Sequence, residues 1–251
     1  MTRRRFIADT WTPTTATLTG DQAVHLARVL RAAPGQIYDI VANGFLHRAE
    51  ITEITAGGKG EDHVVQFNLH EELSAEAALP LHLLLAVFKF DHMEWAIEKS
   101  TELGIARITP ILARRTEKHL AQSSARRVER WRRIALEASK QSRRTDIPEI
   151  ADPVALKSAL AQEKSPTRIL LSETEQQTTL SAALQDSLRP TASEAASQST
   201  AIAIGPEGGW TPEEMSLFTL HQWQPVTLGP RILRAETAAI AAIAIASANL
   251  I

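Results

Sequence analysis

The most informative stretch of the sequence is Ile204-Gly205-Pro206-Glu207-Gly208-Gly209-Trp210-Thr211-Pro212-Glu213-Glu214. It joins an apolar segment, residues 201–204, to a glycine-rich turn and then to the start of a helix. Thr211 fits an N-cap, Pro212 the first helical position, and Glu214 the far end of a capping box. The glycines allow close approach of a ligand and expose backbone N–H groups. The stretch predicts a strand, a turn and a helix in direct succession.

A turn of this kind, taken alone, is more often structural than ligand-binding. It is also neither a Walker A motif nor a G-x-G-x-x-G fingerprint, which argues against a kinase and against a Rossmann dinucleotide site.

A second segment of the same form is Leu228-Gly229-Pro230-Arg231-Ile232-Leu233-Arg234-Ala235-Glu236-Thr237-Ala238. Its arginines and glutamate follow a predicted strand, at the sheet edge where ligands bind in open α/β folds. Cations at a helix N-terminus oppose the helix dipole. Their position indicates a phosphate, a carboxylate or a developing anion nearby, and a purely surface role is the weaker alternative.

Strands and helices alternate through residues 73–251, which predicts an α/β domain with a parallel sheet. The predicted strands are residues 81–88, 105–112, 168–172, 201–204 and 225–228. The predicted helices are residues 93–103, 123–142, 153–162, 179–188, 211–221 and 235–251, with a mobile surface loop at 189–200.

Residues 1–72 have a different pattern, which predicts a small β-barrel joined to the second domain near residue 73. The predicted strands are residues 4–7, 14–18, 36–41, 45–54 and 64–69. Asn43-Gly44 predicts a hairpin turn, Gly57-Gly58-Lys59-Gly60 a flexible loop, and residues 22–30 a short helix that Asp21 can cap.

The charge of the 251-residue chain is unevenly distributed. Overall, 27 Lys and Arg face 29 Asp and Glu, a net of −2. Residues 113–144, called the basic segment below, carry eleven basic and three acidic residues, a local net of +8. Such asymmetry points to a polyanionic partner, whereas the alternative is a solvated helix face. Trp131 has the spacing of a core residue rather than of a base-stacking platform.

The chain contains no cysteine, which excludes disulfides, thiolate metal sites and a cysteine nucleophile. Its eight histidines form no close pair, so no metal is expected. The start MTRRRF lacks a following apolar region, so no signal peptide is expected. The longest apolar run, residues 237–251, is shorter than the roughly 20 residues of a membrane span. We therefore expect a cytoplasmic protein that has no membrane partner.

The segments at residues 204–214 and 228–238 resemble motifs II and III of SPOUT-class methyltransferases. More narrowly, they resemble the bacterial 16S ribosomal RNA uridine-N3 methyltransferases. Residues 98–104 (EKSTELG), residues 132–150 (RRIALEASKQSRRTDIPEI), the RRF start and the helix at 25–31 also resemble that family. The resemblance covers most of the chain. One departure is Lys140, which stands where the family usually has Glu before Gln141.

The resemblance implies a PUA-like barrel in residues 1–72 and a SPOUT α/β domain with a C-terminal trefoil knot in residues 73–251. It implies a homodimer, for which the helix at 238–250 is a plausible interface. It also implies S-adenosylmethionine bound in a bent form by the loops of the knot. The expected contacts are Leu171, Ser172, Gly205, Pro206, Glu207, Gly208, Leu228, Gly229, Ile232, Leu233 and Ala235.

The implied reaction requires removal of the uracil N3 proton, because the neutral nitrogen is a poor nucleophile. Arg234 is the first candidate to stabilise the resulting anion and Arg231 the second. Glu236 and Glu207 are possible bases, or either could orient an arginine. The expected partner is 16S rRNA or the 30S subunit. The expected RNA contacts are Arg3, Arg4, Arg5, Arg126, Arg130, Arg133, Gln141 and Arg144.

Two other functions stay open from the sequence. The chain could be a non-catalytic RNA-binding or ribosome-assembly factor that retains the SPOUT fold, or an enzyme that uses another nucleotide at the same sheet edge. The intact motifs favour the methyltransferase over the assembly factor.

Overall fold

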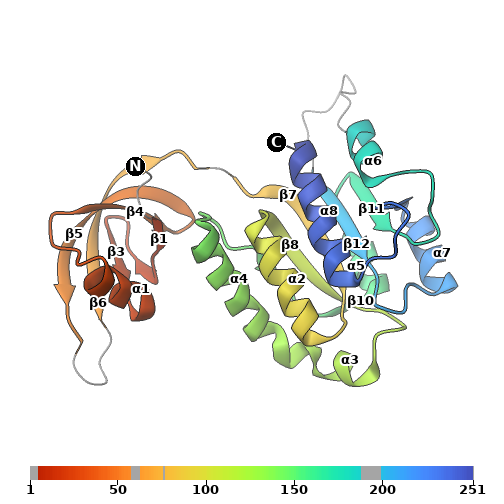
Figure 1. Ribbon diagram of the computed structural model, residues 1–251, viewed down its shortest axis with the longest axis horizontal. Coiled ribbons are helices and arrows are strands. Elements are labelled where there is room, and N and C mark those ends of the chain that lie inside the picture. The colour runs from red at the N-terminus through yellow and green to blue at the C-terminus, as the bar shows by residue number, and fades with distance from the viewer. Residues whose placement is uncertain (1–4, 58–62, 76, 188–198, 251) are drawn as a thin grey trace. The chain divides into compact units, whose positions relative to one another are not determined.

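The computed structural model describes residues 5–57, 63–75, 77–187 and 199–250. Its contacts divide the chain into two compact units, Met1–Ala77 with Ser139–Asp146, and Ala78–Ala138 with Ile147–Ile251 (Figure 1). The domain division at residue 73 stays a prediction. Residues 139–144, the end of the basic segment, belong to the first unit by these contacts. Arg3, Arg4, most of the glycine loop at 57–60 and most of the loop at 189–200 lie outside the described residues.

The first unit is built on a six-stranded sheet with strand order β1-β4-β5-β6-β3-β2. The strands are β1 (Arg5–Ile7), β2 (Thr10–Trp11), β3 (Thr15–Leu18), β4 (Ile37–Ala42), β5 (Phe45–Thr55) and β6 (Val64–Leu73). The helix α1 (Gly20–Val24) continues as one π-helical turn (His25–Val29).

The core of this unit is apolar, and its longest hairpin follows the sequence pattern. Leu18, Leu26 and Phe67 are fully buried in it. The β4–β5 hairpin turns at Asn43 and Gly44, whose positive φ values of 51° and 80° are those that a type I′ turn needs, as predicted. Helix α1 begins after Thr19, so Asp21 lies in its first turn and is not the cap.

The second unit contains a seven-stranded sheet in which every pairing is parallel. The main path runs β10-β8-β7-β12-β11-β13, and β9 pairs with β8. The strands are β7 (Leu79–Ala86), β8 (Ile105–Leu112), β9 (Glu149–Ile150), β10 (Val154–Ala155), β11 (Thr167–Leu171), β12 (Thr200–Ile204) and β13 (Gln224–Val226). The predicted parallel sheet of an α/β fold is confirmed.

Helices cover both faces of this sheet because successive strand residues point to opposite sides. Leu83 and Leu85 of β7 lie in the core formed with α2, α6 and α8, whereas Leu84 packs with residues of α5 and α7 (Figure 1). The helices are α2 (Phe90–Glu102), α3 (Lys118–Ser124), α4 (Val128–Ser142), α5 (Leu156–Gln162), α6 (Leu180–Ser187), α7 (Pro212–Leu220) and α8 (Ala235–Leu250).

Two predicted helices differ from the structure. The helix at 123–142 is divided by a 3-10 turn at Ala125–Arg127, so that only α4 forms a long amphipathic helix. The helix at 153–162 begins at Leu156, because Val154 and Ala155 pair with β8 as a short strand. Trp131 of α4 is fully buried, which confirms its prediction as a core residue.

No helix within the described residues has both the length and the apolar character needed to cross a lipid bilayer.

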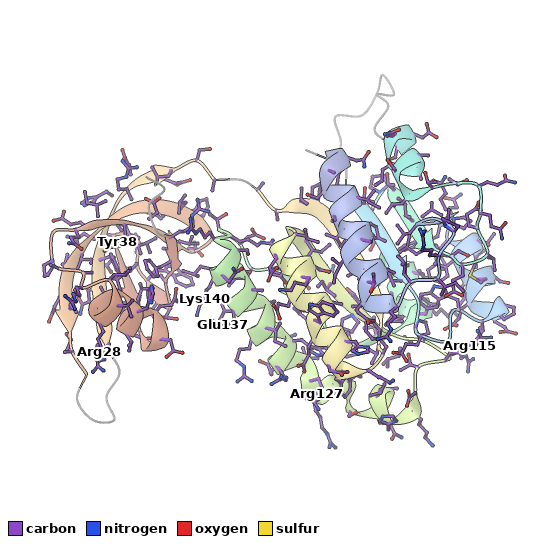
Figure 2. The ribbon with its side chains drawn as sticks, in the orientation of Figure 1. Arg28, Tyr38, Arg115, Arg127, Glu137 and Lys140 are labelled. Atoms are coloured by element: carbon purple, nitrogen blue, oxygen red, sulfur yellow. The ribbon has the colours of Figure 1, made fainter. Side chains whose placement is uncertain are left out.

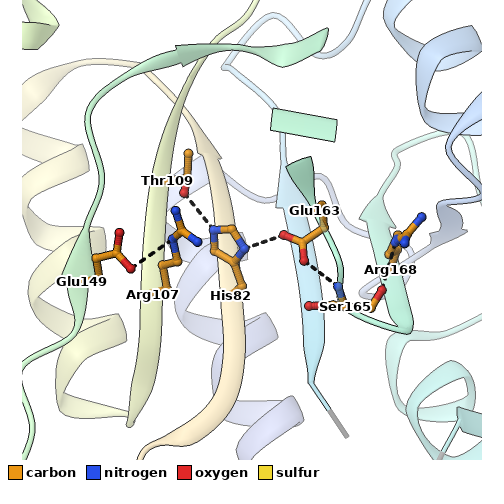
Figure 3. Close-up of polar contacts among 7 residues, drawn as sticks. All are labelled: His82, Arg107, Thr109, Glu149, Glu163, Ser165 and Arg168. Atoms are coloured by element: carbon orange, nitrogen blue, oxygen red, sulfur yellow. Dashed lines mark hydrogen bonds and ion pairs between the residues drawn. The ribbon is translucent and has the colours of Figure 1, made fainter. Parts of the chain in front are cut away.

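A polar network joins His82 of β7, Thr109 of β8 and Glu163 at the end of α5 (Figure 3). Nδ1 of His82 lies 2.5 Å from Oε2 of Glu163, and Nε2 lies 2.8 Å from Oγ1 of Thr109. The Ser165 N–H donates to Oε1 of Glu163 over 2.8 Å. Burial raises the pKa of Glu163, but the hydrogen bonds from His82 and the Ser165 N–H outweigh burial and lower the pKa to about 2.

Glu163 therefore stabilises the fold in a pH-dependent way. Its pKa falls from an ordinary 4.5 to about 2 on folding, so its contribution is complete above pH 4.5 and disappears as the pH drops towards 2. We expect Glu163→Gln to lower the free energy of unfolding by ~2–3 kcal/mol at pH 7, with the difference shrinking towards pH 2. Urea unfolding at several pH values measures it.

The matched control is Glu149→Gln. This carboxylate lies 3.4 Å from Nε of Arg107, but its side chain is 62% exposed, so its removal costs at most about 1 kcal/mol. A deficit of Glu163→Gln that is the same at every pH would contradict the prediction.

Candidate functional site at the carboxyl edge of the parallel sheet

The loops that follow the strands of the parallel sheet meet at one edge. They are residues 87–89 after β7, 113–117 after β8, 172–179 after β11, 205–211 after β12 and 227–234 after β13. Hydrogen bonds hold them in pairs: Oγ1 of Thr116 donates to the Val87 carbonyl over 3.0 Å, and the Thr227 N–H donates to the Thr178 carbonyl over 2.8 Å. Leu171 and Ser172 lie at the same edge, where the Ser172 N–H donates to the Val226 carbonyl over 3.0 Å.

The 205–211 loop ends in the predicted capping box. Oγ1 of Thr211 accepts the Glu214 N–H, and Oε2 of Glu214 accepts the Thr211 N–H over 2.9 Å. Pro212 occupies the first turn, as predicted. The other oxygen of Glu214, Oε1, accepts the Arg114 N–H over 2.8 Å. One buried carboxylate thus caps α7 and ties the 205–211 loop to the loop after β8.

Gly205 and Gly208 of this loop lie in close contact with neighbouring side chains. A Cβ on Gly205 would lie 3.1 Å from Nε1 of Trp210, and one on Gly208 would lie 3.3 Å from Cδ of Arg115. The guanidinium of Arg115, a residue labelled in Figure 2, donates to the Gly208 carbonyl over 2.5 Å. Nε1 of Trp210 is buried without a partner in the described residues. Pro206 is buried, whereas Glu207 and Gly208 are exposed.

The 227–234 loop turns at Gly229, whose φ of 116° lies in the region that favours glycine. Oγ1 of Thr227 accepts the Gly229 N–H over 3.1 Å, which closes the turn. Leu228 and Leu233 are half-buried, and Ile232 is 80% exposed. Ala235 is buried at the start of α8.

Glu207 and Glu236, which lie far apart in the sequence, come together around His92. Nδ1 of His92 lies 3.5 Å from Oε1 of Glu236 and 3.9 Å from Oε1 of Glu207. His92 belongs to the first turn of α2. Sequence reasoning missed this residue, although it follows a strand of the same sheet just as the predicted site segments do. That position was the available signal.

Arg231 and Arg234 are exposed at the N-terminal end of α8. The Arg234 carbonyl accepts the Ala238 N–H over 2.8 Å, so its side chain starts where the helix begins. Among the described residues, neither guanidinium forms an ion pair, including with Glu207 or Glu236. The structure therefore gives no support to the interpretation that these glutamates orient the arginines.

The predicted RNA contacts fall into two groups. Arg126, Arg133 and Gln141 are exposed. Arg130 donates to both carboxylate oxygens of Glu94, over 2.6 and 2.7 Å, while its side chain stays half exposed.

Two further predicted contacts, Arg5 and Arg144, are already engaged within the first unit, and Arg3 and Arg4 lie outside the described residues. The Arg144 side chain is only 8% exposed and pairs with Asp146. Arg5 donates to the Arg143 carbonyl.

Within the part of the chain that the structure describes, no group of three His, Cys, Asp or Glu side chains is arranged to hold a metal ion.

Comparison with known proteins is consistent with this site. Residues 75–247 match the family model described as an RNA methyltransferase domain. The chain is 36% identical over 235 residues to ribosomal RNA small subunit methyltransferase E of a Synechocystis species, covering 92% of this chain and 72% of that protein. It is 32% identical to the protein of the same name from Bacillus subtilis, covering 91% of this chain and 88% of that protein.

A solved structure has the same fold. Ribosomal RNA small subunit methyltransferase E from Neisseria gonorrhoeae, bound to S-adenosylmethionine, matches with a TM-score of 0.75 and 28% identity, covering 97% of this chain and 96% of that chain. The fold and the family match define an RNA methyltransferase. The chain belongs to the RNA methyltransferase family, within the group named ribosomal RNA small subunit methyltransferase E.

Removing the Glu214 carboxylate should lower stability strongly, because it accepts hydrogen bonds from two backbone N–H groups. In Glu214→Ala, the Thr211 and Arg114 N–H groups lose their acceptor in a site where Glu214 is 4% exposed. Because unsatisfied donors cost about 1–3 kcal/mol each, we expect a loss of roughly 2–4 kcal/mol in the free energy of unfolding. Glu213→Ala, at the exposed neighbouring position, is the control and should cost well under half as much. Equal losses in urea unfolding would disprove the role of Glu214.

Proposed function

We propose that this chain transfers a methyl group from S-adenosylmethionine to N3 of a uracil in 16S rRNA of the small ribosomal subunit. The observation that carries the proposal is the meeting of the 205–211 and 227–234 loops with Glu207 and Glu236 at one sheet edge. A family relative that shares this fold over 97% of the chain was solved with S-adenosylmethionine bound.

The residues at this edge fit the methyl donor. The Trp210 indole packs so closely on Gly205 that a Cβ there would lie 3.1 Å from Nε1, and this Nε1 donor has no partner in the described residues. Backbone groups of such loops can bind an adenine edge while aliphatic side chains cover its faces. The proposed contacts are Leu171, Ser172, Gly205, Pro206, Glu207, Gly208, Leu228, Gly229, Ile232, Leu233 and Ala235.

The bound donor supplies an electrophilic methyl group, and the protein must supply an activated nitrogen. Arg234 is proposed to stabilise the negative charge that develops on the uracil, with Arg231 in second place. Both guanidinium groups are exposed beside the site and unpaired within the described residues, so they are free to meet an anion. A positioned cation acts most strongly where charge appears only in the transition state.

The finer features of the fold are also proposals. The resemblance supports a PUA-like barrel in the first unit and a trefoil knot in the second. For the knot, the support is the path of the chain after β13, where Thr227 bonds with both Thr178 and Leu180 before α8 packs against α2 and α6. We also propose a homodimer that uses the outer face of α8. An rRNA substrate would place the protein in the cytoplasm.

Two experiments test the function. Calorimetry should detect binding of S-adenosylmethionine to the protein. Binding of NAD or ATP in its place would favour an enzyme of another class. Purified protein should methylate 30S subunits or 16S rRNA, and mass spectrometry of the digested RNA should find 3-methyluridine. Cofactor binding without any methylated uridine would contradict the proposed reaction, and RNA binding without cofactor would favour an assembly factor.

The role of Arg234 is tested separately from cofactor binding. We expect Arg234→Ala to lower kcat by roughly 100-fold or more, the usual cost of losing one oxyanion-stabilising group. The affinity for S-adenosylmethionine should change less than twofold, because the 227–234 loop keeps its backbone. Arg231→Ala is the paired variant and should have the smaller effect on kcat. Unchanged kcat in Arg234→Ala would remove this residue from the mechanism.

The proposed RNA-binding surface should make the affinity for RNA depend on salt concentration. Each arginine that meets a phosphate contributes about one unit to the slope of log affinity against log salt concentration. Neutralising Arg126 and Arg133 together should reduce the slope by about two.

Arg130 serves as the matched comparison on the same surface. Its charge is already paired with Glu94, so neutralising it should reduce the slope less than neutralising Arg126 or Arg133 does. If the slope of the Arg126 and Arg133 variant equals that of the wild type, the basic segment is only a solvated surface.

A further inference from the structure

We propose that His92 is the base that accepts the N3 proton of the target uracil, and that Glu236 positions its ring. This inference rests on the proposed function and assigns the step that the arginines cannot perform, because an arginine stays protonated in proteins.

The placement of His92 joins three elements at the candidate site. Its ring is 29% exposed and comes from the first turn of α2, beside Glu207 of the 205–211 loop and Glu236 of α8. The Glu236 side chain is only 3% exposed. His92 is therefore within 4 Å of a carboxylate from each of the two predicted motif segments.

The buried atoms of this cluster lack partners. Nδ1 of His92 and Oε2 of Glu236 are buried without a hydrogen bond in the described residues. A buried carboxylate with an unsatisfied oxygen is costly unless a charge or donor faces it. Nδ1 of His92 lies 3.5 Å from Oε1 of Glu236. This distance is slightly longer than that of a good hydrogen bond. Catalytic contacts are often long before substrate binds and shorten in the complex.

Three carboxylates surround the His92 ring. Carboxylates of Glu236 and Glu207 face Nδ1, and Oδ2 of Asp91, on the same helix, lies 3.8 Å from Nε2. All three are negative when ionised, so the imidazolium formed during the reaction is stabilised from α2, the 205–211 loop and α8. Glu236 itself is too deeply buried to reach an RNA base, so it acts through the ring.

In the proposed step, His92 takes the proton of uracil N3 and N3 takes the methyl group. With Nδ1–H directed at Glu236, Nε2 of His92 holds a free electron pair and takes the proton from uracil N3. The N3–H electron pair remains on N3 and forms the bond to the methyl carbon of the donor. The carbon–sulfur pair stays on sulfur, and His92 later releases its proton to water.

The first test separates proton transfer from folding and from cofactor binding. His92→Ala should lower kcat by roughly 100-fold or more, leave calorimetric affinity for S-adenosylmethionine within twofold, and regain activity when imidazole is added. His92→Gln should lose activity without rescue, because its side chain fills the space. A kcat loss in His92→Ala that imidazole does not reverse, or no loss at all, would overturn the assignment.

His70→Ala is the matched control. Nε2 of His70 also lies close to a glutamate, 3.3 Å from Oε2 of Glu50, but the histidine side chain is 46% exposed and belongs to β6, which is part of neither the candidate site nor the basic segment. This variant should keep the wild-type kcat. Wild-type protein that produces no 3-methyluridine would refute the proposed function itself, whereas an active wild type with an equally active His92→Ala refutes only the inference.

A second test needs neither RNA nor methyl donor. Nitrogen-15 NMR of the histidine rings reports which ring nitrogen carries the proton. Neutral His92 should carry it on Nδ1 in the wild type, and the Glu236→Gln variant should show a larger share of the Nε2–H form. A wild-type ring that is protonated on Nε2 would contradict the orientation by Glu236.

Discussion

Parallel pairing within the seven-stranded sheet is the constraint on which the site depends. Each strand must be followed by a crossover before the next parallel strand can begin, so the loops after β7, β8, β11, β12 and β13 all gather at the carboxyl edge. The edge then collects polar residues that lie far apart in the sequence. His92, Glu207 and Glu236 meet there although the first and last are separated by most of the second unit.

The polar groups at this edge are of two kinds, those that form hydrogen bonds and those that do not. Glu214, Thr211 and Thr227 have their polar groups paired, and these hydrogen bonds fix the turns of the two loops. Trp210, His92 and Glu236 keep buried polar atoms without partners in the described residues. Unpaired polar atoms cost stability and are expected where a ligand or a proton will satisfy them. The contrast separates the supporting framework of the site from its reactive part.

Local patterns in the sequence predicted the features that local physics controls. The β8 strand, the Asn43-Gly44 turn and the Thr211–Glu214 capping box each depend on a few neighbouring residues. The short strand β10 was not predictable in this way, because Val154 and Ala155 are extended only through their pairing with β8. His92 was missed for a related reason. Its role comes from the spatial meeting of α2 and α8, and its own surroundings in the sequence carry no motif.

The charge of the basic segment also could not be judged from neighbouring residues alone. The basic segment has a net charge of +8 when counted along the sequence, but several of its partners lie outside it. Glu94 binds Arg130, Asp152 binds Arg132, and Asp146 binds the nearly buried Arg144. Ion pairs of this kind position arginine side chains and reduce the charge available to a phosphate. Arg126 and Arg133, which are exposed, are therefore the stronger candidates for the electrostatic contact with RNA, and a count of basic residues overstates the binding surface.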